Sequence, residues 1–454
     1  MSTIVAISTP PGSGGIGIIR LSGKESFNII EKIFKPKNNS KIKGYSIKYG
    51  NIIDEEGKII DEVLVSYFVE PKSYTSENMC EINTHGNNVI LKEILDLCIK
   101  KGATLAEPGE FTKRAFLNGR IDLSQAESVI DLINSKSEKE KQAAINQLEG
   151  FLSAEINKIK TKVLDIMADI EASIDYPEYD IEERTKESII KESENIKEML
   201  EKLEKSFNTG KILRDGVNVA IVGKPNAGKS SLLNAILKEE RAIVTDIEGT
   251  TRDTIEEFIT IEGILFKLID TAGIRESDNK IEQIGIEKSK EALRKADLVI
   301  AIFDSTKELT EEDLEILKNI KNKKTIILLN KTDLNENILK NNKKIKETNK
   351  DIIEISALKK EGLEELYKKM AEIFRIEKIN TENTSIITNI RHKDAIVSAK
   401  NSILKTKETI EQGMPIDITA IYFKEAIEEL NKITGENVAE DIINEIFSKF
   451  CLGK

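Results

Sequence analysis

A glycine-rich loop lies between a predicted strand and a predicted helix near the middle of this 454-residue chain. Residues 217–222 form an apolar run of strand length, residues 223–230 read G-K-P-N-A-G-K-S, and residues 231–237 have helical spacing. In this context G-x-x-x-x-G-K-[ST] predicts a phosphate-binding loop, because backbone N–H groups turn inward and the helix N-terminus attracts anions. Lys229 is then expected to bridge the outer phosphates, and the hydroxyl of Ser230 to hold Mg²⁺.

Three further motifs follow the glycine-rich loop along the chain. Residues 270–273 (D-T-A-G) end a predicted strand, where a carboxylate can reach Mg²⁺ through water and a glycine N–H can approach the γ-phosphate. Residues 330–333 (N-K-T-D) end another, and Asp333 can accept two hydrogen bonds that guanine donates and adenine does not. Residues 356–358 (S-A-L) match the loop whose backbone N–H groups contact the guanine base, here called the base-backing loop. Together the motifs predict GTP, and an ATPase is the weaker interpretation.

Length and composition limit the class of protein. The length predicts roughly two to four domains, and the chain has enough apolar residues to form a hydrophobic core in each. The net charge of −11 requires any contact with nucleic acid to use a local basic patch. The N-terminus has no basic region followed by an apolar core, and no apolar run approaches about 18 residues, so we expect a cytoplasmic protein without membrane contact. Three cysteines without C-x-x-C spacing and two histidines argue against a zinc cluster.

The flanking regions differ in their patterns. Residues 1–117 alternate strand and helix patterns, and their glycine-rich loop at 12–17 precedes a strand, so the context of a dinucleotide site fails. Apolar residues from Ile145 to Ile170 recur at steps of three and four, which predicts one helix of at least about seven turns. Helical patterns return after residue 394. The simplest architecture is a helical domain in two sequence pieces with the nucleotide-binding domain inserted between them.

Three separated signatures accompany this centre: residues 9–23 open the chain, residues 108–123 precede the helices, and residues 450–454 (F-C-L-G-K) end it. With the central motifs, they closely resemble the MnmE (TrmE) family of tRNA modification GTPases over essentially the full length. The resemblance implies a multidomain fold of α+β and α/β class. Its expected parts are an N-terminal tetrahydrofolate-binding-like α+β domain (1–117), a discontinuous helical domain (118–213 and 377–454) and an inserted Ras-like P-loop GTPase domain (214–376).

The resemblance also implies a function. Members of the family are homodimers that act on tRNA with the flavoprotein MnmG, which carries FAD, in a heterotetramer. They add a (carboxymethyl)aminomethyl group to C5 of the wobble uridine of certain tRNAs. The N-terminal module is the dimerisation unit and binds tetrahydrofolate, in its 5-formyl or methylene form, as the one-carbon donor. Which tRNAs are modified, and whether ammonium or glycine supplies the amine, the sequence leaves open.

The folate site is expected, by motif position, at Arg20, Glu81, Arg120 and Lys454. A carboxylate can accept from the N–H groups of a pterin, and cations can meet glutamyl carboxylates; the alternative for each residue is a surface ion pair. Cys451 lies on the terminal tail, which by resemblance returns to this site, where Lys454 would favour the reactive thiolate. Its role is open between a nucleophile toward a carbon intermediate, a wall residue that orients the cofactor, and a structural thiol.

The water-positioning residue is not the usual glutamine. That position, directly after D-T-A-G, is Ile274, which has no hydrogen-bonding side chain. The sequence offers four nearby carboxylates, Glu276, Asp278, Glu282 and Glu287. The match to the family selects Glu282, acting through a second water.

A cation is expected to replace the arginine finger. The resemblance implies K⁺ held by the side chain of Asn226 and by the backbone around Thr245, Ile247 and Thr250, where its charge stabilises the transition state. Thr251 is the expected second Mg²⁺ ligand, and Arg252 or Arg275 acting in trans is the alternative to K⁺. The expected catalytic residues are Glu282, Lys229 and Cys451. The residues expected to contact nucleotide are Asn226, Ala227, Gly228, Lys229, Ser230, Ser231, Thr245, Asp246, Ile247, Glu248, Gly249, Thr250, Thr251, Asp270, Thr271, Ala272, Gly273, Asn330, Lys331, Asp333, Ser356 and Ala357.

Two other classes of function are alternatives to this one. A GTP-dependent switch for ribosome assembly, similar to Era, would carry a KH-type RNA module with a GXXG loop. A self-contained methyltransferase would need a second cofactor loop in the right context, and the chain offers none.

Overall fold

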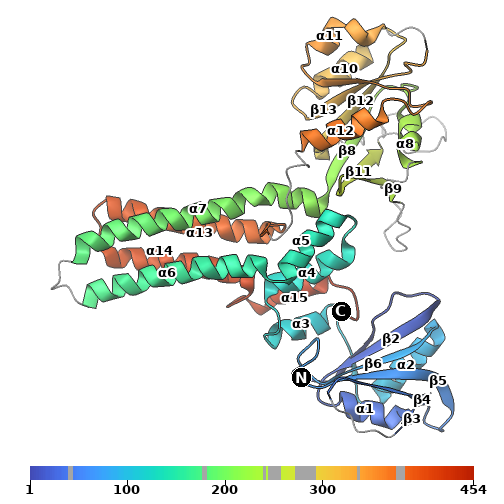
Figure 1. The fold of residues 1–454 in the computed structure, drawn as a ribbon, viewed down its shortest axis with the longest axis vertical. Helices are drawn as coiled ribbons and strands as arrows, with labels where there is room; N and C mark the ends of the chain where they lie inside the picture. Colours follow the sequence, from blue (N-terminus) through green and yellow to red (C-terminus); the bar gives the residue numbers. More distant parts are fainter. Residues whose placement is uncertain are drawn as a thin grey trace. The chain divides into compact units, whose positions relative to one another are not determined.

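The structure is a computed structural model that describes residues 1–38, 44–175, 181–238, 242–243, 257–270, 293–334, 338–374 and 384–454. Only the backbone is described at residues 173–175, 181–185, 242–243, 270 and 341. The chain forms two compact units (Figure 1). The first contains Met1–Ile133, Gln147–Lys202 and Arg391–Lys454, and the second contains Asn134–Asn146 and Leu203–Ile390. The three boundaries between the four predicted segments remain predictions.

A sheet of seven described strands builds the N-terminal part of the first unit, in the order β3-β4-β5-β6-β2-β1-β7. Neighbouring strands are antiparallel except β1 and β7. The strands are β1 (Ile4–Ile7), β2 (Gly14–Ser22), β3 (Phe34–Pro36), β4 (Ser46–Ile53), β5 (Ile59–Phe68), β6 (Met79–Gly86) and β7 (Thr104–Leu105). Because side chains alternate along a strand, one face buries an apolar core under α1 (Ser26–Ile33) and α2 (Asn88–Lys100). The other face carries Arg20 and Glu81.

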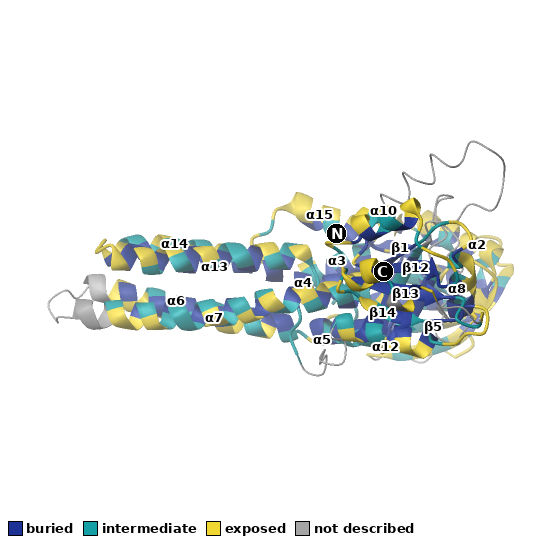
Figure 2. Cartoon of the chain, turned by 90° about the horizontal axis from the view of Figure 1, so that it is seen from above, coloured by how far each residue is buried: buried dark blue, intermediate teal, exposed yellow. Residues whose placement is uncertain are grey.

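Helices form the rest of the first unit, and the helix that begins at Ile181 continues from Leu203 into the second unit. These helices are α3 (Glu110–Leu117), α4 (Leu123–Asn134), α6 (Phe151–Asp175), α7 (Ile181–Asp215), α13 (Ile390–Glu411), α14 (Ile416–Thr434) and α15 (Glu440–Ser448). Helices α6, α7, α13 and α14 lie side by side, and each carries bands of buried and exposed residues (Figure 2). Among the described residues, no helix is both long and apolar enough to cross a membrane.

The prediction that one continuous helix runs from Ile145 to Ile170 is wrong. The chain instead forms α5 (Glu138–Leu148) and then α6, separated by Gly150, whose φ of 87° is left-handed. A left-handed residue ends a helix because the next N–H no longer points along the helix axis. The apolar residues keep their helical spacing across this break, so their pattern did not indicate that the helix ends there.

The second unit is built on another sheet of seven described strands, in the order β14-β13-β12-β8-β11-β10-β9. Strands β14, β13, β12, β8 and β11 are parallel, and β10 and β9 are antiparallel. The strands are β8 (Val217–Val222), β9 (Ala242–Ile243), β10 (Glu257–Ile261), β11 (Ile264–Asp270), β12 (Leu298–Asp304), β13 (Thr325–Asn330) and β14 (Asp351–Glu354). The helices are α8 (Lys229–Leu237), α10 (Glu311–Asn319), η2 (Leu339–Asn341), α11 (Lys343–Lys346) and α12 (Leu363–Ile373).

Two apolar cores cover the two faces of this sheet. One contains residues of α8 and α12, and the other contains residues of α10, η2 and α11. A parallel sheet buried on both faces is the α/β architecture that alternating strands and helices predict. The predicted fold class is confirmed: an α+β N-terminal part, a helical part in two sequence pieces and an α/β nucleotide-binding part.

A buried ionic cluster connects α4, α13 and α14 in the first unit. The carboxylate of Glu127 lies 2.7 Å from Nε2 of His392 and 2.8 Å from Nη2 of Arg391. Arg391 also donates to the backbone carbonyls of Lys432 and Ile433. Burial opposes ionisation of Glu127, but His392 and Arg391 outweigh it and hold its pKa at about 2.

We expect Glu127→Gln to lower the free energy of unfolding of the first unit at pH 7 by about 3 kcal/mol, the equivalent of a pKa of about 2 in place of 4.5. Because the folded-state pKa is depressed, the stabilisation is complete above the ordinary value and is lost as pH falls toward 2. Urea unfolding followed by circular dichroism at several pH values measures this. Glu445→Gln, which removes an exposed ion pair with Lys449, serves as the control. Equal stability of Glu127→Gln and wild type at pH 7 would contradict the prediction.

Candidate functional site

The glycine-rich loop connects β8 to α8 in the second unit. A Cβ on Gly223 would lie 2.5 Å from the carbonyl oxygen of Ile302, and one on Gly228 would lie 2.1 Å from Nδ2 of Asn330. Gly228 also has a φ of 108°, so only glycine fits at both positions. Asn226 has a φ of 61°, and asparagine is among the few other residues that tolerate this region.

Lys229, at the start of α8, is held across this loop. Its Nζ donates to the carbonyl oxygens of Gly223 at 2.6 Å and Lys224 at 3.0 Å. Ser230 and Ser231 follow in the first turn of the helix, and both are exposed. The predicted phosphate-binding side chains therefore lie together at a helix N-terminus, the place where backbone N–H groups favour an anion.

Asn330 joins three of the predicted motifs. Its Nδ2 donates to the carbonyl oxygen of Ala227 at 2.9 Å, and its Oδ1 accepts from the N–H of Ala357 at 3.0 Å. The hydroxyl of Ser356 donates to Asp333 Oδ1 at 2.7 Å. These residues follow β8, β13 and β14, whose carboxyl ends share one edge of the sheet because the strands are parallel.

The D-T-A-G motif begins at the same edge. Asp270 is the last residue of β11, and its backbone pairs with Ile221 of β8. Ile274 lies outside the described residues. So do the other predicted residues of this region, which are Thr245, Asp246, Ile247, Glu248, Gly249, Thr250, Thr251, Thr271, Ala272, Gly273 and Glu282. Of the predicted metal ligands, the structure therefore describes Asn226 and Ser230. Among described residues, no group of three or more His, Cys, Asp or Glu side chains is arranged to hold a metal.

Two buried carboxylates beside this site were not expected from the sequence. Asp304, the last residue of β12, pairs with Lys331 of the N-K-T-D motif, and Asp313 of α10 pairs with Lys224 of the glycine-rich loop. An aspartate at the carboxyl end of an otherwise apolar strand was the signal that could have identified Asp304.

A second cluster lies on the open face of the N-terminal sheet. Arg20 of β2 and Glu81 of β6 are direct cross-strand partners, and Arg20 Nε lies 2.8 Å from Glu81 Oε1. Arg20 Nη1 donates to the carbonyl oxygen of Gly453 at 3.0 Å, and Ser8 Oγ donates to the same oxygen at 3.1 Å. The C-terminal tail therefore lies against the N-terminal sheet. A Cβ on Gly453 would be 2.5 Å from the carbonyl oxygen of Ile7, which favours glycine there.

Two aromatic rings, not expected from the sequence, complete this cluster. The Arg20 guanidinium carbon lies 5.7 Å from the centre of the Phe111 ring and 5.9 Å from that of Tyr74, and the guanidinium carbon of Arg120 lies 4.6 Å from Tyr74. Burial and the nearby Arg20 charge lower the pKa of Lys454, against the opposite influence of Glu81 and Cys451. The four predicted folate residues, which come from distant parts of the sequence, thus lie in one region. Cys451 is a free, exposed thiol on the same tail.

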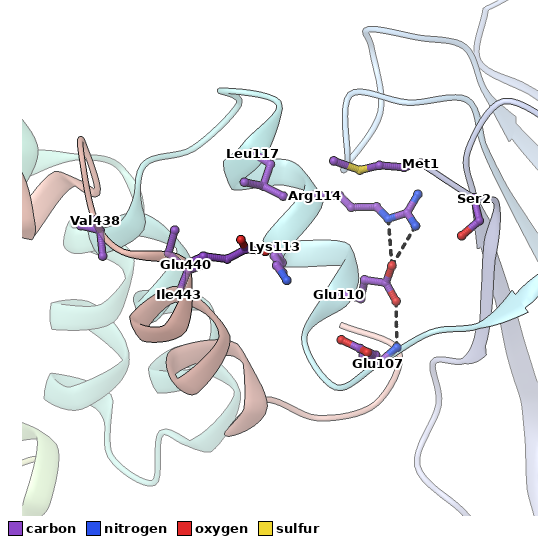
Figure 3. A pocket seen from close by; sticks show the side chains of 10 residues that line it. All are labelled: Met1, Ser2, Glu107, Glu110, Lys113, Arg114, Leu117, Val438, Glu440 and Ile443. Atoms are coloured by element: carbon purple, nitrogen blue, oxygen red, sulfur yellow. Dashed lines mark hydrogen bonds and ion pairs between the residues drawn. The ribbon is translucent and has the colours of Figure 1, made fainter.

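A separate cavity of about 530 Å³ lies beside α3 (Figure 3). Glu110, Lys113, Arg114 and Leu117 line it at helical spacing, whereas Phe111, which packs near Arg20, does not. The buried Arg114 is neutralised by Glu110 at 2.8 Å and by Glu77 at 3.1 Å. None of the predicted folate residues lines this cavity, so this cavity and the predicted folate site are different places.

The nucleotide site defines the class of the protein. A parallel sheet whose carboxyl edge brings a phosphate-binding loop beside an N-K-T-D motif and its backing loop is the architecture of a P-loop GTPase.

Comparisons with known proteins identify the family. The family model of the MnmE helical domain matches residues 123–451, and that of the TrmE N-terminus matches residues 3–120. Relatives named tRNA modification GTPase MnmE, from Acetivibrio thermocellus and Clostridioides difficile, are 50% and 49% identical, and each match covers 100% of this chain and 99% of the relative. The chain therefore belongs to the MnmE family of tRNA modification GTPases.

Solved structures of other GTPases are also similar to part of this chain. A variant of Aquifex aeolicus Era bound to GDP and AlF₄⁻ is 28% identical over 41% of this chain and 66% of that chain, with a TM-score of 0.26. The G domain of the FeoB iron transporter of T. maritima is 30% identical over 34% of this chain and 97% of that chain, with a TM-score of 0.26.

Proposed function

We propose that this GTPase modifies tRNA together with the flavoprotein MnmG, adding a (carboxymethyl)aminomethyl group to C5 of the wobble uridine. The added one-carbon unit comes from tetrahydrofolate bound on the open face of the N-terminal sheet, and FAD is carried by the partner. The observation that supports this most is the cluster of Arg20, Glu81, Arg120 and Lys454 beside two aromatic rings.

The chemistry of this cluster suits a reduced folate. Arg20 orients Glu81 through Oε1, so the second carboxylate oxygen can accept from the N–H groups of a pterin. Tyr74 offers an aromatic ring to the pterin, whereas Phe111 is fully buried and packs near Arg20. The cations Arg120 and Lys454 can meet the glutamyl carboxylates. Each contact uses a residue type suited to one end of the ligand.

We expect Glu81→Ala in the full-length chain to weaken binding of 5-formyltetrahydrofolate by at least about ten-fold, because a charge-assisted hydrogen bond is lost. Isothermal titration calorimetry measures the affinity. Glu62→Ala is the matched control, since Glu62 is an exposed carboxylate of the neighbouring β5 whose partner is Lys37. Wild-type affinity of the Glu81 variant, or no binding by the wild-type chain, would contradict the proposed folate site.

The same open face supports the proposed homodimer. Ile47, Tyr49 and Leu64 are exposed apolar residues on adjacent strands, and Tyr49 and Leu64 are direct cross-strand partners. Ile47 is the cross-strand partner of Ser66, Ser66 is that of Glu81, and Glu81 is that of Arg20. These four residues therefore lie in one line across the strands, on the same face of the sheet. A second copy of the chain is the occupant we propose for this apolar surface, because exposed apolar clusters of this kind mark association sites.

For GTP hydrolysis we propose Mg²⁺ held by Ser230 and Thr251, and K⁺ held by Asn226 with the backbone of Thr245, Ile247 and Thr250. The left-handed backbone at Asn226 supports a special role for this exposed side chain within the glycine-rich loop. A monovalent cation beside the phosphates would supply the charge that an arginine finger supplies in other GTPases.

We expect GTP hydrolysis to be at least about ten-fold faster in K⁺ than in Na⁺ at equal ionic strength, because the ion stabilises transition-state charge. Asn226→Ala should remove that difference and leave GTP binding largely intact. Asn226→Gly is the control for backbone strain, since glycine tolerates the φ of 61° while lacking the ligand oxygen. Phosphate release in the two salts gives the rates, and equal rates for the wild-type chain would end the cation hypothesis.

A further inference from the structure

We propose that Asp304 and Asp313 are positioning residues of the nucleotide site. They stand at the two ends of the connection from β12 to α10, and each holds a lysine that belongs to a nucleotide-binding motif. The proposal rests on the GTPase class alone and is independent of the proposed folate and tRNA chemistry.

Asp304 binds Lys331, the residue that directly follows β13. Its Oδ2 accepts from Lys331 Nζ at 2.6 Å, while its Oδ1 accepts from the N–H and the hydroxyl of Thr306 at 3.1 and 2.7 Å. The adjacent N–H of Ser305 donates to the carbonyl oxygen of Asn330 at 3.0 Å. Lys331 itself has a left-handed φ of 71°, which few non-glycine residues adopt. Asp304 thereby stabilises the backbone turn that leads from Asn330 to the guanine-reading Asp333.

Asp313 likewise binds a lysine of the glycine-rich loop, Lys224. Its Oδ2 accepts from Lys224 Nζ at 2.8 Å, and also from the N–H and hydroxyl of Thr310, which caps α10. Lys224 lies two residues before Asn226, and its own carbonyl oxygen accepts from Lys229 Nζ at 3.0 Å. A lysine anchored at this point restrains the first half of the phosphate-binding loop.

Burial makes these two pairs stronger than surface ion pairs. The side chains of Asp304 and Asp313 are each only 3% exposed, and their lysine partners are 32% and 15% exposed. Burial opposes ionisation of both aspartates, yet the hydrogen bonds from lysine and threonine lower the pKa of each. The carboxylates are therefore charged at neutral pH, and removing one partner leaves the other charge in a poorly solvated place.

The two aspartates should have different effects on nucleotide selection. ITP lacks the exocyclic amine of guanine, so it loses one of the two hydrogen bonds to Asp333 and keeps all phosphate contacts. Asp304→Asn retains an acceptor for Thr306 and removes the charge that holds Lys331. We expect it to weaken GTP binding by about ten-fold and ITP binding by less, so that the preference for GTP shrinks.

Lys224→Ala tests the other pair without removing the Thr310–Asp313 cap of α10. We expect GTP and ITP binding to weaken equally, by about ten-fold, because the glycine-rich loop meets only the phosphates. Lys224→Arg should restore much of the affinity, since it returns a cation to Asp313. Lys369→Ala is the control, because it removes an ion pair with Asp351 at the amino end of β14, opposite the nucleotide edge.

Fluorescence titration of the full-length variants with both nucleotides, beside thermal melting, measures these effects. Unequal losses for Asp304→Asn, equal losses for Lys224→Ala and wild-type behaviour of Lys369→Ala support the proposal. Affinities within two-fold of wild type in folded Asp304→Asn and Lys224→Ala overturn it, as does a lowered melting temperature with unchanged affinity. Equal losses of GTP and ITP in Asp304→Asn overturn its assigned role at the base.

Discussion

Glu282→Ala is expected to lower kcat for GTP hydrolysis by about 10²–10³-fold while GTP affinity changes little. The reason is that Ile274 occupies the position of the usual water-orienting glutamine and has no polar side chain. We propose that a carboxylate positions the water instead, and a group used mainly in the transition state affects kcat rather than binding. Single-turnover hydrolysis, with nucleotide affinity measured separately, tests this.

Glu287→Ala is the matched control for Glu282→Ala, since both are carboxylates of the same short segment. It should hydrolyse GTP at close to the wild-type rate. A large loss for Glu287→Ala with near-normal activity of Glu282→Ala would move the assignment to Glu287. A loss of GTP affinity equal to the loss of rate would instead indicate a role in binding.

Cys451→Ser is expected to abolish tRNA modification in the assay reconstituted with MnmG, while GTP hydrolysis and dimerisation stay at wild-type levels. The thiol is exposed on a tail that is held to the N-terminal sheet by Arg20 and Ser8 through Gly453. Serine retains the backbone contact in which the N–H of Gly109 donates to the residue-451 carbonyl oxygen at 3.3 Å. Only the sulfur chemistry is removed, since a thiolate is far more nucleophilic than a hydroxyl at neutral pH.

Gly453→Ala separates the thiol from the docking of the tail. A Cβ there would lie 2.5 Å from the carbonyl oxygen of Ile7, so the tail should detach and folate binding should weaken with modification. Cys451→Ser should lose modification with folate binding intact. Full modification by Cys451→Ser, measured by nucleoside analysis of the product tRNA, would show that the thiol is dispensable.

Local sequence patterns predicted the elements that a short stretch can specify. Apolar runs placed the strands β8, β11 and β13, because a strand buried on both faces has few polar residues. Helical spacing after residue 394 predicted helices in the C-terminal region, where the structure has α14 among others. The same spacing failed at Gly150, because side-chain period does not report backbone conformation.

The partners of charged side chains depended on tertiary structure. Asp304 and Lys331 are brought together by the parallel pairing of β12 and β13, and Asp313 reaches Lys224 from a different helix. Neither pair has a local pattern, since the residues of each lie far apart in sequence. Tyr74 joined the N-terminal cluster for the same reason.

By itself the sequence determined the nucleotide class and the family of this protein, because phosphate and guanine recognition require particular residues at short, fixed spacings. Only the tertiary structure decided that Arg20, Glu81, Arg120 and Lys454 lie in one region, and that Asn330 ties the glycine-rich loop to the base-backing loop. Such convergence depends on strand order and on where the chain ends come to lie. These are set by burial of apolar surface over the whole chain rather than by any local motif.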